Sequence, residues 1–470
     1  MDIDAAIRAN TEKMRAANVP EPSIRAFALA LESVASGHPA NISESCIKPI
    51  QSLPNYCDLP PIRDSQVLEE FAIVKLNGGL GTGMGLECAK SLLHVKDGQT
   101  FLDLIAKQVL FRRGKSSRIS VPLIFMNSFS THYDSVQYLS RFPDLMAEPS
   151  TFLMQSMVPK IRIGDLMPAS CGSQPKNEWC PPGHGDFYPT LFASGLIPRL
   201  LALGIRYLFV SNSDNLGATL DPTLAQYFAS SGLSFLMEVA ERTPSDRKGG
   251  HLASRLTDDR LILREFLQTV EADIPHFQNI ERHRFFNTNN LWIDLASLSE
   301  LLAIHRGFVR LAVIQNRKPI IPSDLSSEPI IQIETAMGCA IQEFEKSGAL
   351  VVPRSRFIPV KTTSDLLLIR SDAYRVLPDA TLNAAFEGSK SLPLILLDES
   401  HYKLLENFEK LIGGAIPSVL NCSKLKVNGR CRFETGVVCE GDVEFTGTDS
   451  GVSVIPGGYY RDVRVEVECG

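Results

Sequence analysis

Short apolar runs and helical patterns alternate along the middle of this chain. Short, mostly apolar segments predict buried strands at Phe71–Leu76, Ser120–Met126, Thr151–Met157, Arg206–Val210 and Leu233–Val239. Between them, apolar residues recur at helical spacing, for example from about Leu102 and over residues 195–203. This alternation predicts an α/β fold with a doubly wound, mostly parallel sheet, whose ligand site lies at the carboxyl ends of the strands.

The two ends of the chain follow other patterns. Residues 1–65 begin with a helical pattern and continue into a loop rich in proline and polar residues. From residue 415 to 470, short segments alternate apolar and polar positions, with a glycine every six to ten residues. That pattern favours a few turns of a parallel β-helix. We therefore expect an N-terminal helical region (1–65), a large α/β domain (66–414) and a small C-terminal β-helix-like domain (415–470).

A glycine-rich loop follows the first predicted strand. Residues 76–85 read LNGGLGTGMG, with five glycines in eight positions, and Lys90 follows shortly after. Glycine lets backbone N–H groups approach a phosphate closely, so the segment predicts a nucleotide-binding loop. A turn that only packs a helix onto a sheet is the alternative. The spacing fits neither the dinucleotide fingerprint nor the Walker A loop, because Met84, Leu86 and Ala89 interrupt them, which argues against a nicotinamide oxidoreductase.

Composition excludes several other classes. The net charge of −6 and the lack of a Lys/Arg cluster give no footprint for nucleic acid. No apolar run is long enough to span a membrane, and the charged N-terminus has no secretory pattern. The ten cysteines form no C-x-x-C pair, so zinc is not expected, and reduced thiols indicate a cytoplasmic protein.

Two polar clusters are candidates for chemistry. Asp214 follows a predicted buried strand, where a carboxylate next to bound phosphates suits Mg²⁺; an Asx turn is the alternative. Three amides at Asn287, Asn289 and Asn290 lie in an apolar frame. Buried amides need partners, so these side chains indicate a polyhydroxyl ligand or a turn capped by its own side chains.

Four segments together resemble one known family. LNGGLGTGMG with Lys90, PPGHGD at 181–186, FNTNNLW at 286–292 and RSRF-x-PVKTTSDL at 354–366 are similar to motifs of the eukaryotic-type UTP–glucose-1-phosphate uridylyltransferases. The resemblance implies a nucleotidyltransferase domain of GT-A-like, Rossmann-like type, an N-terminal helical cap and a C-terminal left-handed β-helix. That β-helix serves some family members as an oligomerisation surface, so a homo-oligomer is possible.

The resemblance also assigns roles to individual residues. As catalytic residues it implies Lys90, Lys361 and Asp214, the last as the Mg²⁺ ligand. As nucleotide-binding residues it implies Leu76, Asn77, Gly78, Gly79, Gln155, Gly183, Asn212 and Lys361. As sugar-binding residues it implies Gly78, Gly79, His184, Asn212, Ser213, Asp214, Glu265, Thr288, Asn289 and Asn290.

The implied reaction makes UDP-glucose and pyrophosphate from UTP and glucose 1-phosphate, reversibly, with Mg²⁺. A phosphate nucleophile is already ionised at neutral pH, so no general base is required. The chain carries no hydrolase-type motif, which agrees with this reaction. Two alternatives stay open: an enzyme of broader sugar range, including the N-acetylhexosamine type, and a non-catalytic nucleotide-sugar-binding scaffold.

Overall fold

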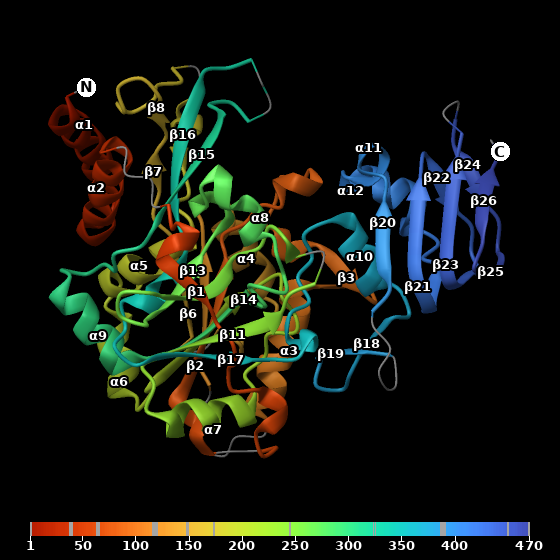
Figure 1. The fold of residues 1–470 in the computed structure, drawn as a ribbon, viewed down its shortest axis with the longest axis horizontal. Coiled ribbons are helices and arrows are strands. Elements are labelled where there is room, and N and C mark those ends of the chain that lie inside the picture. Colours follow the sequence, from red (N-terminus) through yellow and green to blue (C-terminus); the bar gives the residue numbers. More distant parts are fainter. Residues whose placement is uncertain are drawn as a thin grey trace.

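A large α/β body carries the N-terminal helices on one side and a separate stack of strands at its C-terminal end (Figure 1). The computed structural model describes residues 2–36, 41–62, 66–114, 121–146, 150–172, 174–243, 246–322, 324, 326–385, 392–448 and 451–468. Ser120, the first residue of one predicted strand, and residue 65, an expected domain limit, lie outside the described residues.

A ten-stranded sheet forms the body, and its main strand order is β1-β12-β14-β10-β2-β5-β6. Strands β10, β2, β5 and β6 run parallel to one another, whereas β14 runs antiparallel to both β10 and β11. The strands are β1 (Ile47–Pro49), β2 (Phe71–Asn77), β5 (Leu123–Asn127), β6 (Thr151–Met154), β10 (Tyr207–Asn212), β11 (Phe235–Glu241), β12 (His251–Arg255), β13 (Leu261–Arg264), β14 (Phe285–Asp294) and β17 (Ser347–Val351).

Helices cover both faces of this sheet. Along β2, Phe71 and Ile73 join one apolar cluster while Ala72 and Val74 join another, because successive side chains point to opposite faces. The first cluster includes residues of α3 (Phe101–Arg113) and α7 (Pro222–Ser231). The second includes α5 (Phe187–Ala193), α6 (Leu196–Ala202) and α9 (Leu295–Ile304). Burial on both faces explains the continuous apolar strands, and the predicted doubly wound α/β fold is confirmed.

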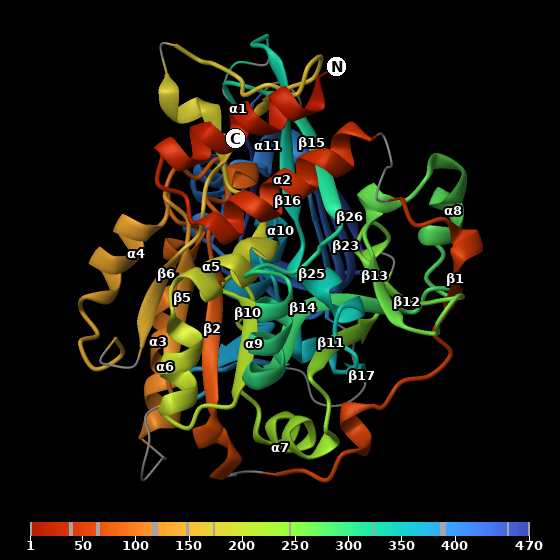
Figure 2. The ribbon, with the colours of Figure 1, turned by 90° about the vertical axis from the view of Figure 1, so that its left-hand side faces the viewer.

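The two N-terminal helices lie on one wall of the body. Helices α1 (Ile3–Ala16) and α2 (Glu21–Ala35) pack against short strands near β15 and β16, as Figure 2 shows. Their apolar residues, among them Met14, Phe27 and Leu31, share a cluster with Val158 and Ile333. This wall contains β7 (Val158–Pro159), β8 (Ile161–Arg162), β9 (Trp179–Cys180), β15 (Val313–Pro319) and β16 (Pro329–Thr335).

The C-terminal strands stack in parallel. Strand β21 (Ser418–Asn428) lies between β20 (Leu394–Leu397) and β23 (Val437–Gly447), and β23 pairs in turn with β25 (Gly458–Arg461) and β26 (Arg464–Val467). Leu425 lies opposite Val443, so apolar residues stack from turn to turn. The second parallel pair is β22 (Cys431–Phe433) with β24 (Ser453–Ile455). Because β20 belongs to this stack, the pairing extends N-terminally beyond the expected limit at residue 415.

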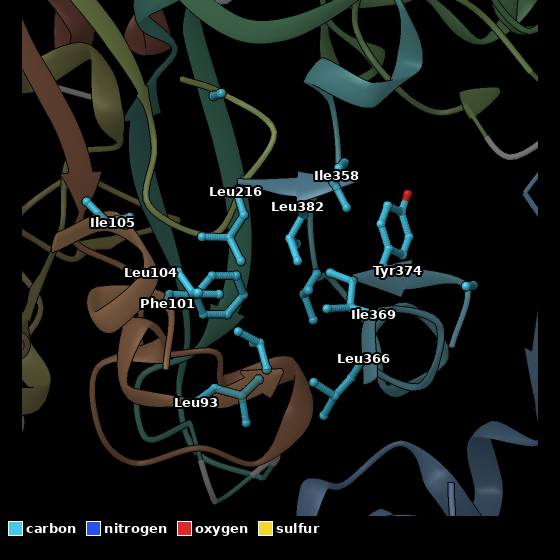
Figure 3. Close-up of a cluster of buried hydrophobic side chains, with 14 of the residues drawn as sticks. Leu93, Phe101, Leu104, Ile105, Leu216, Ile358, Leu366, Ile369, Tyr374 and Leu382 are labelled. Carbon is cyan, nitrogen blue, oxygen red and sulfur yellow. The ribbon is translucent and has the colours of Figure 1, made fainter. Parts of the chain in front are cut away.

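One core joins the body to this C-terminal stack. Phe101 and Leu104 of α3 share one apolar cluster with Leu366 of α10 (Thr363–Arg370), as Figure 3 shows. The same cluster contains Leu425 and Val443 of the stack. The other described elements are β3 (His94–Lys96), β4 (Gln99–Thr100), α4 (His132–Leu139), α8 (Ile274–Phe277), β18 (Tyr374–Val376), β19 (Leu382–Ala384), α11 (Glu399–Tyr402) and α12 (Leu405–Phe408). Among the described helices, none has both the length and the apolar character that a bilayer crossing requires.

Candidate active site

The polar candidates gather at one edge of the sheet. Asn77 at the end of β2 pairs with Asn127 of β5, which pairs with Met154 of β6, and Asn212 of β10 pairs with Leu76. The loops that leave these four parallel strands therefore start side by side. They contain the glycine loop, Gln155 and Asp214, as expected for a doubly wound sheet.

The glycine loop has a conformation that depends on its glycines. Gly81 has a φ of +67°, and a Cβ there would lie 2.8 Å from the side chain of Leu86 and 3.1 Å from that of Lys90. The loop closes on itself where the N–H of Lys90 donates to the carbonyl of Gly79 at 3.1 Å. A Cβ on Gly79 would meet no atom within 4 Å, so this side of the loop faces open space.

Lys90 and Asp214 form an ion pair at this edge. Lys90 Nζ lies 2.6 Å from Asp214 Oδ2, and the two side chains are 15% and 21% exposed. The neighbouring N–H of Ser213 donates to the carbonyl of Leu76 at 3.0 Å, which ties the loop after β10 to β2. A cation and a carboxylate, both reachable from solvent, therefore lie next to the glycine loop.

Lys361 is held close to the same loop through the backbone. Asn215 and Pro359 form an isolated antiparallel bridge, and the N–H of Val360 donates to the carbonyl of Asp214 at 3.3 Å. Thr362, the N-cap of helix α10, directly follows Lys361 and forms a capping box with Asp365. The Lys361 side chain is exposed, with its Nζ 5.9 Å from the centre of the Phe357 ring, so a second cation faces solvent from the segment bonded to Asp214.

Gln155 and the Pro181–Asp186 turn form a second part of the site. Gln155 Nε2 donates to the carbonyl of Gly183 at 2.6 Å, and Gln155 is buried. Gly183 has a φ of +81°, and a Cβ there would lie 2.5 Å from the carbonyl oxygen of Thr335. A side chain at this position is therefore excluded by both conformation and space.

His184 is held as a neutral ring. The N–H of Met337 donates to its Nδ1 at 3.0 Å, so the neutral ring carries its proton on Nε2. Partial burial of the ring disfavours its charged form and lowers the pKa of His184 to about 4. At neutral pH this side chain is a hydrogen-bond donor without charge.

Two of the three amides, Asn289 and Asn290, lie on a bulge in β14, and Asn287 is the last paired residue before it. β11 pairs with β14 at Met237 opposite Leu291 and at Val239 opposite Asn287, so residues 288–290 lie opposite Glu238 alone. Asn289 has a φ of +61°, and its Nδ2 donates to Asn212 Oδ1 at 2.9 Å. Its buried Oδ1 has no partner among the described residues, as expected for an atom that binds a ligand.

Other predicted residues are placed differently. Thr288 donates to the backbone of Glu238 at 2.7 Å, and Asn290 donates to its carboxylate at 3.0 Å, so both side chains point into the protein. Asn77 is also buried, with its amide donating to Asn127 and Ser135. The Thr288 and Asn290 side chains therefore bond to Glu238, whereas Asn77 Oδ1 accepts from Ser213 Oγ at 3.1 Å, directly next to Asp214.

Glu265 lies beside the loop that precedes β12. A Cβ on Gly250 would lie 2.6 Å from Glu265 Oε2. Burial raises the pKa of Glu265, and the nearby charge of Lys361 opposes this shift. Glu265 thus belongs to the same region as Lys361, although the two are almost a hundred positions apart in sequence.

Known proteins share this sequence and this fold. Residues 25–440 match the family described as UTP--glucose-1-phosphate uridylyltransferase. The chain belongs to this family. The Solanum tuberosum UTP--glucose-1-phosphate uridylyltransferase is 38% identical over 401 residues, covering 85% of this chain and 81% of the relative. The Saccharomyces cerevisiae protein of the same name is 37% identical over 392 residues, covering 83% and 77%.

Solved structures agree with this assignment to the uridylyltransferase family. A variant of UDP-glucose pyrophosphorylase from Leishmania major, in complex with UDP-glucose, superposes with a TM-score of 0.93 at 43% identity. It covers 98% of this chain and 99% of its own. A Trypanosoma brucei protein described as a UDP-glucose phosphorylase has a TM-score of 0.92 at 44% identity, covering 98% and 100%.

Sequence reasoning missed the buried charges under the uridylyltransferase site. Glu238 is fully buried and accepts from Arg356 at 2.7 and 2.8 Å and from Trp292 Nε1 at 2.9 Å. Asn215 adds to this network, since its amide donates to the carbonyl of Arg356 at 3.1 Å. Glu238 lies between the apolar residues Met237 and Val239 of β11, and a charge at such a position was a signal for a buried ion pair.

Proposed function

We propose that this chain makes UDP-glucose and pyrophosphate from UTP and glucose 1-phosphate, reversibly, by in-line attack on the α-phosphate of UTP. One observation carries the proposal: the Lys90–Asp214 pair, with its 2.6 Å contact, closes a glycine loop on the same sheet edge as the Gln155–Gly183 pair. Groups suited to phosphates and groups suited to a pyrimidine edge are therefore neighbours.

The reaction needs positioning and charge neutralisation more than acid–base catalysis. An oxygen of glucose 1-phosphate forms the new bond to the α-phosphorus, and pyrophosphate leaves with the electron pair of the broken bond. The attacking phosphate is largely dianionic at neutral pH, since its second pKa is about 6. Lys90 and Lys361 would offset charge on the reacting phosphates, while the N–H groups of Gly78 and Gly79 would hold the nucleotide.

Asp214 is the residue that would hold Mg²⁺. Its partly exposed carboxylate beside the glycine loop fits the one or two carboxylates that Mg²⁺ uses together with phosphate oxygens and water. The described residues contain no group of three or more His, Cys, Asp or Glu side chains that could hold a metal ion. A bound Mg²⁺ would neutralise phosphate charge.

The remaining contacts would select the base and the sugar. With Gln155 Nε2 donating to Gly183, its Oε1 is left to accept from N3–H of uracil. The unpartnered Asn289 Oδ1 suits a sugar hydroxyl, and Glu265 can accept another. His184 Nε2 can donate to the sugar-phosphate, whereas Asn212, Ser213, Thr288 and Asn290 would act through backbone groups or by supporting Asn289.

The test is pyrophosphate release over a panel of nucleoside triphosphates and sugar 1-phosphates with Mg²⁺. We expect UTP with glucose 1-phosphate to exceed all other pairs. Lys90→Ala and Asp214→Ala should each lower turnover by at least about a hundredfold, as removal of one electrostatic group typically does. Lys48→Ala is the matched control, because Lys48 forms an exposed ion pair with Asp259 and has no proposed role in the site. Near-normal turnover in both site variants would contradict the proposal.

Two alternatives give other outcomes in the same experiment. Similar rates with several sugar 1-phosphates would favour an enzyme of broader sugar range. UDP-glucose binding without turnover of any pair would favour a scaffold. Assembly through the C-terminal stack and a cytoplasmic location remain part of the proposal, and gel filtration of the full chain tests the first of them.

A further inference from the structure

Helix α2 packs against the wall of short strands that includes β7 and β9. Gln155 and Gly183, the proposed uracil-reading residues, lie in the loops next to these two strands. Lys13 pairs with Glu178 at 2.6 Å, and Asn10 donates to the carbonyl of Leu166 at 2.9 Å, so α1 also joins this wall. Val158, three residues after Gln155, belongs to the same apolar cluster as Phe27 of α2. The N-terminal helices therefore contact the loops around Gln155 and Gly183 rather than a remote surface.

Asp186, the last residue of the PPGHGD segment, connects three parts of this region. Its carboxylate accepts from Ser23 Oγ of α2 at 3.0 Å, from the backbone N–H of Ser156 at 2.7 Å and from Thr190 Oγ1 at 2.7 Å. Ser156 Oγ also donates to Ser23 Oγ at 2.8 Å. Asp186 is 5% exposed, and burial raises its pKa to about 6. A buried carboxylate held only by neutral donors needs a reason other than ion pairing.

These contacts close a ring of hydrogen bonds that consists of Gln155, Ser156, Asp186 and Gly183 and includes the proposed base-reading pair. Ser156 follows Gln155 directly, and Gln155 Nε2 donates to the carbonyl of Gly183. The same carbonyl accepts from the N–H of Asp186 at 3.3 Å. The loop after β6 and the turn before α5 are thus joined twice, once by Gln155 with Gly183 and once by Asp186 with Ser156.

Helix α2 is held by apolar packing on one side and meets a cavity on the other. Its apolar residues share a buried cluster with the strand wall, whereas a cavity of about 460 Å³, lined by Phe27, Ala30, Pro182 and Asp186 among others, lies between α2 and the turn. Because interiors gain rigidity from close packing, packing holds the helix less firmly on the side of the cavity. On that side the Ser23–Asp186 hydrogen bond joins the helix directly to the turn.

We propose that Asp186 and Ser23 are positioning residues for the uracil of UTP, so that helix α2 forms part of the nucleotide site. Asp186 fixes the backbone of Ser156, which orients Gln155 toward Gly183, and Ser23 fixes the Asp186 carboxylate. Neither side chain contacts the base. The inference rests on the proposed function, because it needs Gln155 and Gly183 to read the base.

The experiment compares base selectivity in full-length variants. CTP differs from UTP at the pyrimidine edge that Gln155 and Gly183 would read, so the ratio of kcat/KM for UTP over CTP reports the pair directly. Ser23→Ala should raise the KM for UTP about tenfold and lower this ratio, because a lost hydrogen bond to a carboxylate is worth about one order of magnitude. Its kcat and its KM for glucose 1-phosphate should stay within about twofold.

Two further variants separate positioning from general stabilisation. Asp186→Asn keeps an oxygen that accepts from the N–H of Ser156, so it should retain most of the selectivity that Asp186→Ala loses. Arg25→Ala is the matched control, since Arg25 also joins α2 to the body, through the carbonyl of Arg306 at 3.2 Å, but lies outside the ring. We expect normal selectivity in Arg25→Ala.

The outcomes distinguish this inference from the proposed function. If Gln155→Ala loses the UTP preference while Ser23→Ala and Asp186→Ala keep it, the positioning role is wrong and the function stands. Equal losses in Ser23→Ala and Arg25→Ala also overturn it. If Gln155→Ala leaves the preference unchanged, the proposed base contact itself fails. Should Asp186→Ala not fold, Ser23→Ala decides the question alone.

Discussion

Removing the charge of Glu238 should destabilise the protein through the cations that it leaves behind. Arg356 contacts both oxygens of this carboxylate, and Lys75 lies close by. Burial and the charge of Arg356 lower the pKa of Lys75 to about 7, and the charge of Glu238 opposes that shift. In Glu238→Gln, the amide oxygen and the carbonyl of Thr219, at 3.0 Å, can still accept from Arg356, but the buried guanidinium loses its carboxylate. The protein loses stability because the positive charge of Arg356 stays buried without a carboxylate beside it.

The expected loss in the free energy of unfolding follows from the burial of both Glu238 and Arg356. Breaking a buried pair by changing one residue costs about 3–5 kcal/mol. A chain of 470 residues unfolds with an entropy of about 1 kcal/mol per kelvin, so Tm should fall by about 3–5 °C. Arg356→Met should cost a similar amount. In the double variant the loss should be smaller than the sum by about 1–3 kcal/mol, because neither charge is left alone. Thermal melts of the four proteins followed by circular dichroism measure these values.

A matched control lies on the same strand. Glu241 of β11 pairs with Arg284 at 2.7 Å, but these side chains are 63% and 50% exposed. An exposed pair is worth at most about 1 kcal/mol, so Glu241→Gln should shift Tm by no more than about one degree. Equal shifts for Glu238→Gln and Glu241→Gln, or additive losses in the double variant, would refute this account of the buried pair.

Two more predictions concern the glycine loop and Asp186. Gly81→Ala forces a Cβ onto Leu86 at positive φ, which costs about 1–3 kcal/mol, so the KM for UTP in steady-state assays should rise about tenfold or more. Gly83→Ala, whose Cβ would meet nothing within 4 Å, should keep the normal KM; similar values for both variants would contradict the steric argument. Because the folded-state pKa of Asp186 is about 6, above its usual 3.8, its contribution to stability is present below pH 3.8 and is lost as the pH rises through 6, by about 3 kcal/mol. Urea unfolding at several pH values should therefore show Asp186→Asn gaining stability relative to the unmodified protein as pH rises, and a relative loss would show that the carboxylate is not raised.

The pattern of apolar residues along the chain explains which parts of the fold could be predicted. The run from Phe71 to Leu76 is apolar at every position but Lys75 because β2 is covered on both faces, so its apolar character and length sufficed to identify it. The bulge in β14 was not predictable, because it arises from pairing with β11 across some fifty positions. That pairing decides that Asn289 turns toward Asn212 while Asn290 and Thr288 turn toward Glu238.

The candidate site also has one part that the sequence determined and another that only the fold determined. The sequence by itself determined the glycine loop, the lysine that follows it, the PPGHGD turn and the family, because each of these is encoded in consecutive residues. Tertiary structure decided which charges meet: Lys90 with Asp214, 124 positions apart, and Ser23 with Asp186, 163 positions apart. Such contacts depend on how strands are ordered and how helices dock. The spacing of residues along the chain does not determine that order. The contact of helix α2 with the site could therefore be identified only in the folded chain.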